Sequence, residues 1–139
     1  MPYYRFIAEE ELAAIRRNGA LLPQGHYPPY KPNEIICVFE SGDLAALFKK
    51  YGTALTEQRE MGAGKKLIAI EVVGFSGRME LDKSQNGGWP ESRAIFDPIP
   101  LERIRIVAQA VVEDVRGGQV ILGRLQFDPQ HLPRLSTHN

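Results

Sequence analysis

Two long apolar runs near the end of the chain constrain its fold more than any other feature. They span residues 104–115 and 119–127, and Arg116-Gly117-Gly118 separates them. Both runs alternate roughly between apolar and polar side chains, as strands with one buried face do. Two strands joined by a turn with paired glycines predict an antiparallel hairpin. We therefore expect a sheet with antiparallel strands in this half of the chain.

The first half of the sequence predicts two helices, each preceded by a strand. Residues 2–7 form the first predicted strand, and residues 8–18 form a helix with acidic residues in its first turn and arginines in its last. This charge order complements the helix dipole. A second strand at residues 34–40 leads to a helix that is expected to begin after Ser41 as its N-cap and to end at Gly52. Further along, the sequence predicts a loop at 53–66, strands at 67–73, 77–81 and 92–96, and a turn-rich connection at 83–88.

Helices early in the chain and strands late in it predict the α+β fold class, with two helices packed on a mostly antiparallel sheet. The chain has 139 residues, of which 43% are hydrophobic and 24% are charged. This length and composition suit one globular core. We expect a single domain over residues 1–128 and a C-terminal tail over residues 129–139.

The composition argues against several classes of function. Lys plus Arg and Asp plus Glu number 17 each, so the net charge is zero and the basic excess of nucleic-acid-binding proteins is missing. No apolar run is long enough to span a membrane. The one cysteine, Cys37, allows no internal disulfide and no zinc-ligand spacing, and its apolar surroundings predict a buried, inert thiol. We expect a cytoplasmic protein without a metal.

A proline-rich loop is predicted at residues 22–33, because its four prolines exclude a helix and a central strand. This loop carries His26, which could bind a phosphate or ribose, act as an acid or base near neutral pH, or simply be solvated. Tyr27 and Tyr30 could stack on a flat ligand or pack the loop onto the core. With a ligand nearby, the three side chains would form a lid.

Arg5 and Glu91 are the other candidate site residues. Arg5 stands inside an apolar strand, where its guanidinium could clamp a pyrophosphate or carboxylate, or protect an edge strand from aggregation. Glu91 precedes the strand at 92–96, and a carboxylate there could stabilise a cationic sugar centre or accept a hydrogen bond from a ribose hydroxyl. Arg93, two residues later, would face the same side and could pair with Glu91.

Several short motifs can be taken together. They are Tyr4-Arg5-Phe6, the helix end Ile15-Arg16-Arg17-Asn18-Gly19-Ala20-Leu21-Leu22-Pro23, Cys37-Val38-Phe39-Glu40-Ser41, and Glu91 ahead of Asp97-Pro98-Ile99-Pro100-Leu101-Glu102-Arg103-Ile104. In this order they resemble small ADP-ribosyltransferase-like domains of bacterial toxin and modification systems. The resemblance implies a split sheet and NAD as the substrate.

In that family, an arginine of the first strand holds the NAD phosphates or ribose. A Ser or Thr at the end of the second strand supports the nicotinamide pocket, and a glutamate on a later strand orients the nicotinamide ribose. The resemblance places these roles on Arg5, Ser41 and Glu91. It implies that the domain transfers or hydrolyses the ADP-ribose of NAD, with a protein, a nucleic acid or water as the acceptor.

The sequence departs from the family pattern in one place. The family's glutamate usually lies inside the strand, nearer the Pro-Ile-Pro turn, where Arg93 and Ala94 stand here. With Arg93 at the catalytic position, the domain would bind without catalysis. The alternative function is therefore a non-catalytic module of the immunity, antitoxin or phage accessory type that binds a protein partner on the same scaffold.

Overall fold

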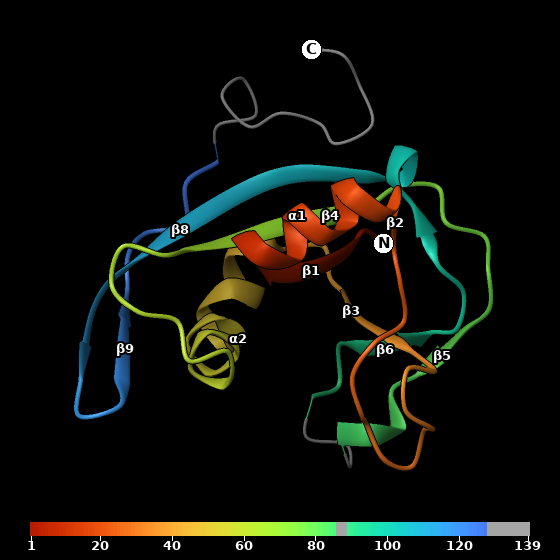
Figure 1. Ribbon diagram of the computed structural model, residues 1–139, viewed down its shortest axis with the longest axis horizontal. Helices are drawn as coiled ribbons and strands as arrows, with labels where there is room; N and C mark the ends of the chain where they lie inside the picture. Colours follow the sequence, from red (N-terminus) through yellow and green to blue (C-terminus); the bar gives the residue numbers. More distant parts are fainter. Residues whose placement is uncertain (86–88, 128–139) are drawn as a thin grey trace.

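The computed structural model describes residues 1–85 and 89–127, which form an α+β fold (Figure 1). The predicted fold class is therefore confirmed. The predicted tail at 129–139 and the end of the connection at 83–88 lie outside the described residues. The elements are β1 (Tyr3–Ala8), α1 (Glu9–Asn18), β2 (Ala20–Leu21), β3 (Ile36–Glu40), α2 (Leu44–Gln58), β4 (Lys66–Val72), β5 (Met79–Leu81), β6 (Ser92–Ile95), β7 (Ile99–Pro100), β8 (Ile104–Arg116) and β9 (Gln119–Leu122), with 3-10 turns at Lys83–Gln85 and Leu101–Arg103.

Seven strands form one antiparallel sheet in the order β5-β6-β3-β1-β4-β8-β9, while β2 and β7 pair separately. The long strand β8 pairs with both β4 and β9. β8 and β9 form the predicted hairpin, and its turn residues Gly117 and Gly118 have φ angles of 58° and 80°. Glycine adopts this left-handed conformation without steric cost. β9 ends at Leu122, and a single bridge between Gln109 and Gln126 ties the following residues to β8.

Both faces of the sheet are covered, and its central strands are apolar on both sides. α2 packs on one face, where Leu47 belongs to the same buried cluster as Phe6 of β1. α1 covers the other face, where Ile15 belongs to the same buried cluster as Ile7 of β1. Successive side chains of a strand point to opposite faces, so neighbouring residues of β1 serve two different cores.

The sheet is nearly divided between β1 and β3. β1 pairs with β4 at six positions and β3 pairs with β6 at four, but β1 and β3 pair at two, Tyr3–Glu40 and Tyr4–Phe39. Beyond Tyr4 the two strands diverge, and Figure 1 shows β3 running away from β1 toward β6. The backbone groups that face this gap need partners outside the strand ladder.

The second helix begins with a different cap from the predicted one. Oδ1 of Asp43 accepts a hydrogen bond from the backbone N–H of Ala46 at 3.0 Å, so Asp43 is the N-cap of α2. The Ser41 hydroxyl instead accepts from the backbone N–H of Asp43, one step before the helix. The prediction of Ser41 as the cap was wrong, because both residue types favour this position and only the backbone path selects between them.

The second helix is also longer than predicted. α2 continues through Gly52 to Gln58, so the loop predicted from residue 53 was wrong over 53–58. Leu55 continues the buried face of the helix. A Cβ at Gly52 would lie 2.9 Å from the Phe48 ring and 3.3 Å from the Leu122 side chain. The glycine therefore allows close packing inside the helix and does not end it.

Replacing Asp43 with Ala should lower the free energy of unfolding by about 1 kcal/mol, because an amide of the first helical turn loses its acceptor. Ser41→Ala should cost less, since its hydroxyl contacts an amide outside the helix. Urea unfolding monitored by circular dichroism measures both values. A larger loss for Ser41→Ala than for Asp43→Ala would contradict the assignment of the cap.

Candidate functional site

A small cleft lies where β1 and β3 diverge. Its volume is about 60 Å³, enough for one small planar group of a ligand and far below the volume of a whole dinucleotide site. The cleft is bounded by β1, β3, the start of β6, the C-terminal end of α2 and the proline-rich loop. Its lining residues are Arg5, Phe6, Tyr27, Cys37, Phe39, Leu55, Gln58, Arg59, Trp89 and Ser92.

Two arginines bridge the gap between the diverging strands. Nη1 of Arg5 donates to the carbonyl oxygen of Cys37 on β3 at 2.8 Å. Nη2 of Arg59, at the end of α2, donates to the carbonyl oxygen of Phe6 on β1 at 3.0 Å. These side chains supply the hydrogen bonds that a continuous ladder would have made, so the sheet can separate here without leaving these carbonyls unpaired.

Glu11 of α1 holds both arginines in place. Its Oε1 accepts from Nε of Arg59 at 2.6 Å, and its Oε2 lies 3.5 Å from Nη2 of Arg5. Burial opposes the charge of Glu11, but the hydrogen bond from Arg59 and the positive charge of Arg5 outweigh it and hold the Glu11 pKa below its ordinary value. The three side chains form a largely buried group with one net positive charge.

One buried nitrogen of this group has no partner among the described residues. The Arg5 side chain is 10% exposed, and its Nε atom is buried. Within residues 1–85 and 89–127, this Nε–H has no hydrogen-bond acceptor. An unpaired buried donor is costly, and native proteins rarely keep one without a reason. Because Arg5 lines the cleft, an oxygen atom of a bound ligand could accept this hydrogen bond.

Aromatic rings form one side of the cleft and connect it to Glu91. Trp89 lines the cleft and lies 4.8 Å from the ring of Tyr51, measured between ring centroids. The Tyr51 hydroxyl donates to Oε1 of Glu91 at 2.6 Å, and Nζ of Lys50 lies 3.0 Å from Oε2. The hydrogen bond from Tyr51, with help from Lys50, lowers the pKa of Glu91. Glu91 is therefore ionised at neutral pH.

A buried carboxylate, Asp82, contacts two of the lining residues from outside the cleft. Oδ2 of Asp82 accepts from the Ser92 hydroxyl at 2.7 Å and from the Cys37 thiol at 3.4 Å. Burial opposes the charge of Asp82, but the hydrogen bonds from Ser84, Ser92 and Cys37 outweigh it and lower its pKa. Burial and the Asp82 charge raise the pKa of Cys37 to about 12. The cysteine is a neutral thiol, consistent with the inert cysteine that the sequence predicts.

The structure brings two of the predicted site residues, Arg5 and Tyr27, to the cleft. Tyr30 is buried, and its hydroxyl donates to Glu80 at 3.0 Å, so it packs the proline-rich loop onto the core. His26 is exposed on that loop. Among the residues that line the cleft, neither His26 nor Tyr30 is found.

Ser41 and Glu91 lie beside each other at the ends of their strands but do not line the cleft. The backbone N–H of Glu40, next to Ser41, donates to the carbonyl oxygen of Glu91 at 2.8 Å. The Ser41 hydroxyl is used locally at the start of α2. Arg93 lies 3.5 Å from Glu40, so it does not form the pair with Glu91 that its spacing suggested.

Sequence reasoning missed three polar residues of the site, namely Arg59, Asp82 and Ser92. Arg59 falls in the region predicted as a loop, and its role depends on the true length of α2. Asp82 and Ser92 are ten residues apart, across a connection with no recognisable motif. Trp89 could have been predicted as a site residue, because it is the one tryptophan in the sequence and stands two residues before the candidate Glu91.

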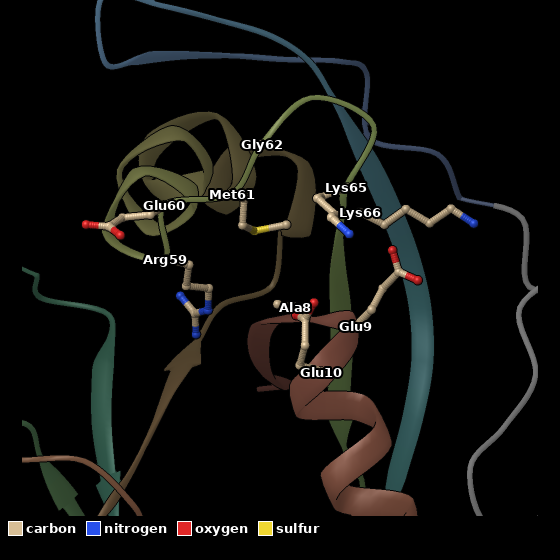
Figure 2. Close-up of a pocket in the computed structure, with 9 residues that line it drawn as sticks. All are labelled: Ala8, Glu9, Glu10, Arg59, Glu60, Met61, Gly62, Lys65 and Lys66. Atoms are coloured by element: carbon tan, nitrogen blue, oxygen red, sulfur yellow. The ribbon is translucent and has the colours of Figure 1, made fainter.

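A second hollow, of about 200 Å³, lies behind Arg59 (Figure 2). Its acidic residues are Glu9 and Glu10 at the start of α1 and Glu60 after α2. Lys65 precedes β4, and Lys66 is the first residue of that strand. In Figure 2 these side chains surround the space from opposite sides. Because charges of both signs line it, this hollow does not favour a ligand of either charge.

Comparisons with protein-family models, with curated proteins and with solved structures found no match for this chain. Within the described part of the chain, no three His, Cys, Asp or Glu side chains are grouped as metal ligands. None of the helices in residues 1–85 and 89–127 is long and apolar enough to cross a membrane. The cleft geometry therefore carries the functional argument.

The Glu11 carboxylate should make stability depend on acidic pH. Its pKa is lowered in the folded state, so the unfolded chain binds the proton more tightly. The resulting stability is present above the ordinary pKa of 4.5 and is lost as the pH falls through the folded-state value. Urea unfolding of Glu11→Gln across this range should lack this part of the loss. Glu10→Gln, at an exposed neighbour, should follow the wild-type profile, and an identical profile for Glu11→Gln would contradict the assignment.

Proposed function

We propose that the chain is an ADP-ribosyltransferase-like domain that binds NAD at the cleft and transfers or hydrolyses its ADP-ribose. The observation that carries this proposal is the position of Arg5. This arginine of the first strand stands where the two central strands separate, and its buried Nε–H lacks a partner among the described residues. Such a donor, in a cleft with aromatic walls, suits a group of a nucleotide that presents an oxygen atom next to a flat apolar face.

The contacts of Arg5 define how it would hold the ligand. Its Nη1 contacts the Cys37 carbonyl oxygen and its Nη2 contacts Glu11, so each terminal nitrogen already has a partner, whereas the Nε–H has none among the described residues. The remaining Nε–H suits one neutral oxygen, such as a ribose hydroxyl or a carbonyl. We therefore propose that one small group of NAD enters the cleft and that its phosphates stay outside.

The proline-rich loop would cover the bound dinucleotide. Tyr30 anchors this loop through Glu80, and Tyr27 reaches the cleft. His26 is exposed to solvent on this loop, so its side chain is available to bind a phosphate or ribose. A loop with one fixed point and one contact residue can order over a ligand without rearranging the sheet.

Glu91 is the proposed catalytic residue. The backbone N–H of Ser92 donates to the carbonyl oxygen of Trp89 at 3.0 Å, and this turn places Glu91 between two residues that line the cleft. Its ionised carboxylate could stabilise the positive charge that develops on the ribose as nicotinamide leaves. Tyr51 and Lys50 keep this carboxylate charged. Ser41 has no role in this proposal, because its hydroxyl is used at the start of α2.

Incubation of the protein with NAD should release nicotinamide, measured by chromatography. Glu91→Gln should reduce the rate by roughly a hundredfold or more, because the transition-state charge loses its counter-ion. Its melting temperature should stay near that of the wild type, since Gln can still accept from Tyr51. Glu102→Gln, at an exposed residue outside the cleft, is the matched control and should keep full activity. No nicotinamide release, together with an unchanged melting temperature at millimolar NAD, would contradict the proposal.

One observation favours the alternative of a non-catalytic protein-interaction module. Arg5 and Arg59 already contact Glu11 and the carbonyl oxygens of Cys37 and Phe6, which is sufficient to hold the split sheet together. Under this alternative, the cleft is a structural joint and a protein partner binds elsewhere on the scaffold. The NAD experiment separates the two, because a structural joint gives neither nicotinamide release nor a shift of the melting temperature.

A further inference from the structure

We infer that the cleft selects a neutral planar amide over the matching carboxylate, and that Ser92 and Asp82 determine this specificity. The inference rests on the proposed function, since it identifies which group of NAD would enter the cleft. NAD carries one primary carboxamide on its nicotinamide ring. A primary amide has an acceptor oxygen and donor hydrogens in one plane, and the cleft offers partners for both.

The Ser92 hydroxyl determines what one side of the cleft can bind. Ser92 is 2% exposed and lines the cleft, and its hydroxyl hydrogen is used in the 2.7 Å bond to Asp82. A hydroxyl has one hydrogen and two lone pairs, so the oxygen of Ser92 can only accept from a ligand. The Ser92 side of the cleft therefore calls for a group that carries N–H or O–H.

The Arg5 side of the cleft calls for a hydrogen-bond acceptor on the ligand. The Nε–H of Arg5 is buried and unpaired in the described part of the chain, so the ligand should place an oxygen there. An amide meets both demands at once, with its carbonyl oxygen toward Arg5 and its N–H toward Ser92. A carboxylate could accept the hydrogen bond from Arg5, but it could not donate one to Ser92, because it has no hydrogen to donate.

The charge balance around the cleft also favours an uncharged group. Arg5 and Arg59 carry two positive charges, and Glu11 and Asp82 carry two negative charges, so the group is neutral without a ligand. A ligand carboxylate would add a negative charge without a partner to a poorly solvated space, which is unfavourable. It would also face Asp82 through Ser92. An uncharged amide adds no such cost.

The test compares two dinucleotides that differ in this group alone, NAD and its deamido form, in which the nicotinamide is replaced by nicotinic acid. Isothermal titration should show NAD binding at least about tenfold more tightly, the value expected for losing one hydrogen bond to a buried group. Asp82→Asn should bring the two affinities close together, because Asn removes the negative charge and allows Ser92 to donate. Asp97→Asn, at an exposed carboxylate outside the cleft, is the control and should keep the wild-type ratio.

Ser92→Ala provides a second variant if Asp82→Asn does not fold, since Asp82 keeps its hydrogen bonds from Ser84. It should weaken NAD by roughly tenfold and leave the deamido form nearly unchanged. Equal binding of the two dinucleotides to the wild type, or an unchanged ratio in both cleft variants, would overturn this inference and leave the proposed function standing. Failure of both dinucleotides to bind would overturn the proposed function and this inference together.

Discussion

The structure depends on the group formed by Arg5, Glu11 and Arg59, which supplies hydrogen bonds where β1 and β3 diverge in the middle of the sheet. Arg5 and Arg59 take over the hydrogen bonds of β3 and β1, and Glu11 fixes both guanidiniums from α1. A buried carbonyl without a donor costs free energy, so a central gap would otherwise be unstable. With these contacts the sheet can open and still keep apolar cores on both faces.

This joint explains why the small cleft with mixed polar walls lies where β1 and β3 diverge. The charged side chains that stabilise the gap also line it, and Ser92 and Cys37 are held against it by Asp82. Within residues 1–85 and 89–127, the Arg5 Nε–H is buried without a partner, and the Ser92 oxygen keeps a free acceptor position beside its bond to Asp82. A site of this kind favours hydrogen-bond geometry over net charge in choosing a ligand, because the ionised groups around it already balance.

The sequence predicted the regular elements well wherever local periodicity was strong. The α+β class, the central strands, the first helix and the glycine hairpin of β8 and β9 all follow from alternation, charge order and turn residues. The predictions failed where a residue type has two uses. The sequence predicts a helix end at Gly52, but this glycine allows close packing with Leu122. It predicts Ser41 as the cap, but Asp43, two residues later, can accept the same hydrogen bond and is the cap.

By itself the sequence determined that an arginine lies inside an apolar first strand, that tyrosines stand on a proline-rich loop, and that a carboxylate precedes β6. Only the tertiary structure decided what these groups contact. The partners of Arg5 and Arg59 lie 32 and 48 residues away at Cys37 and Glu11. No local pattern encodes such pairings, because they arise when α1, α2 and the diverging strands pack together, and that packing decides which polar atoms remain free for a ligand.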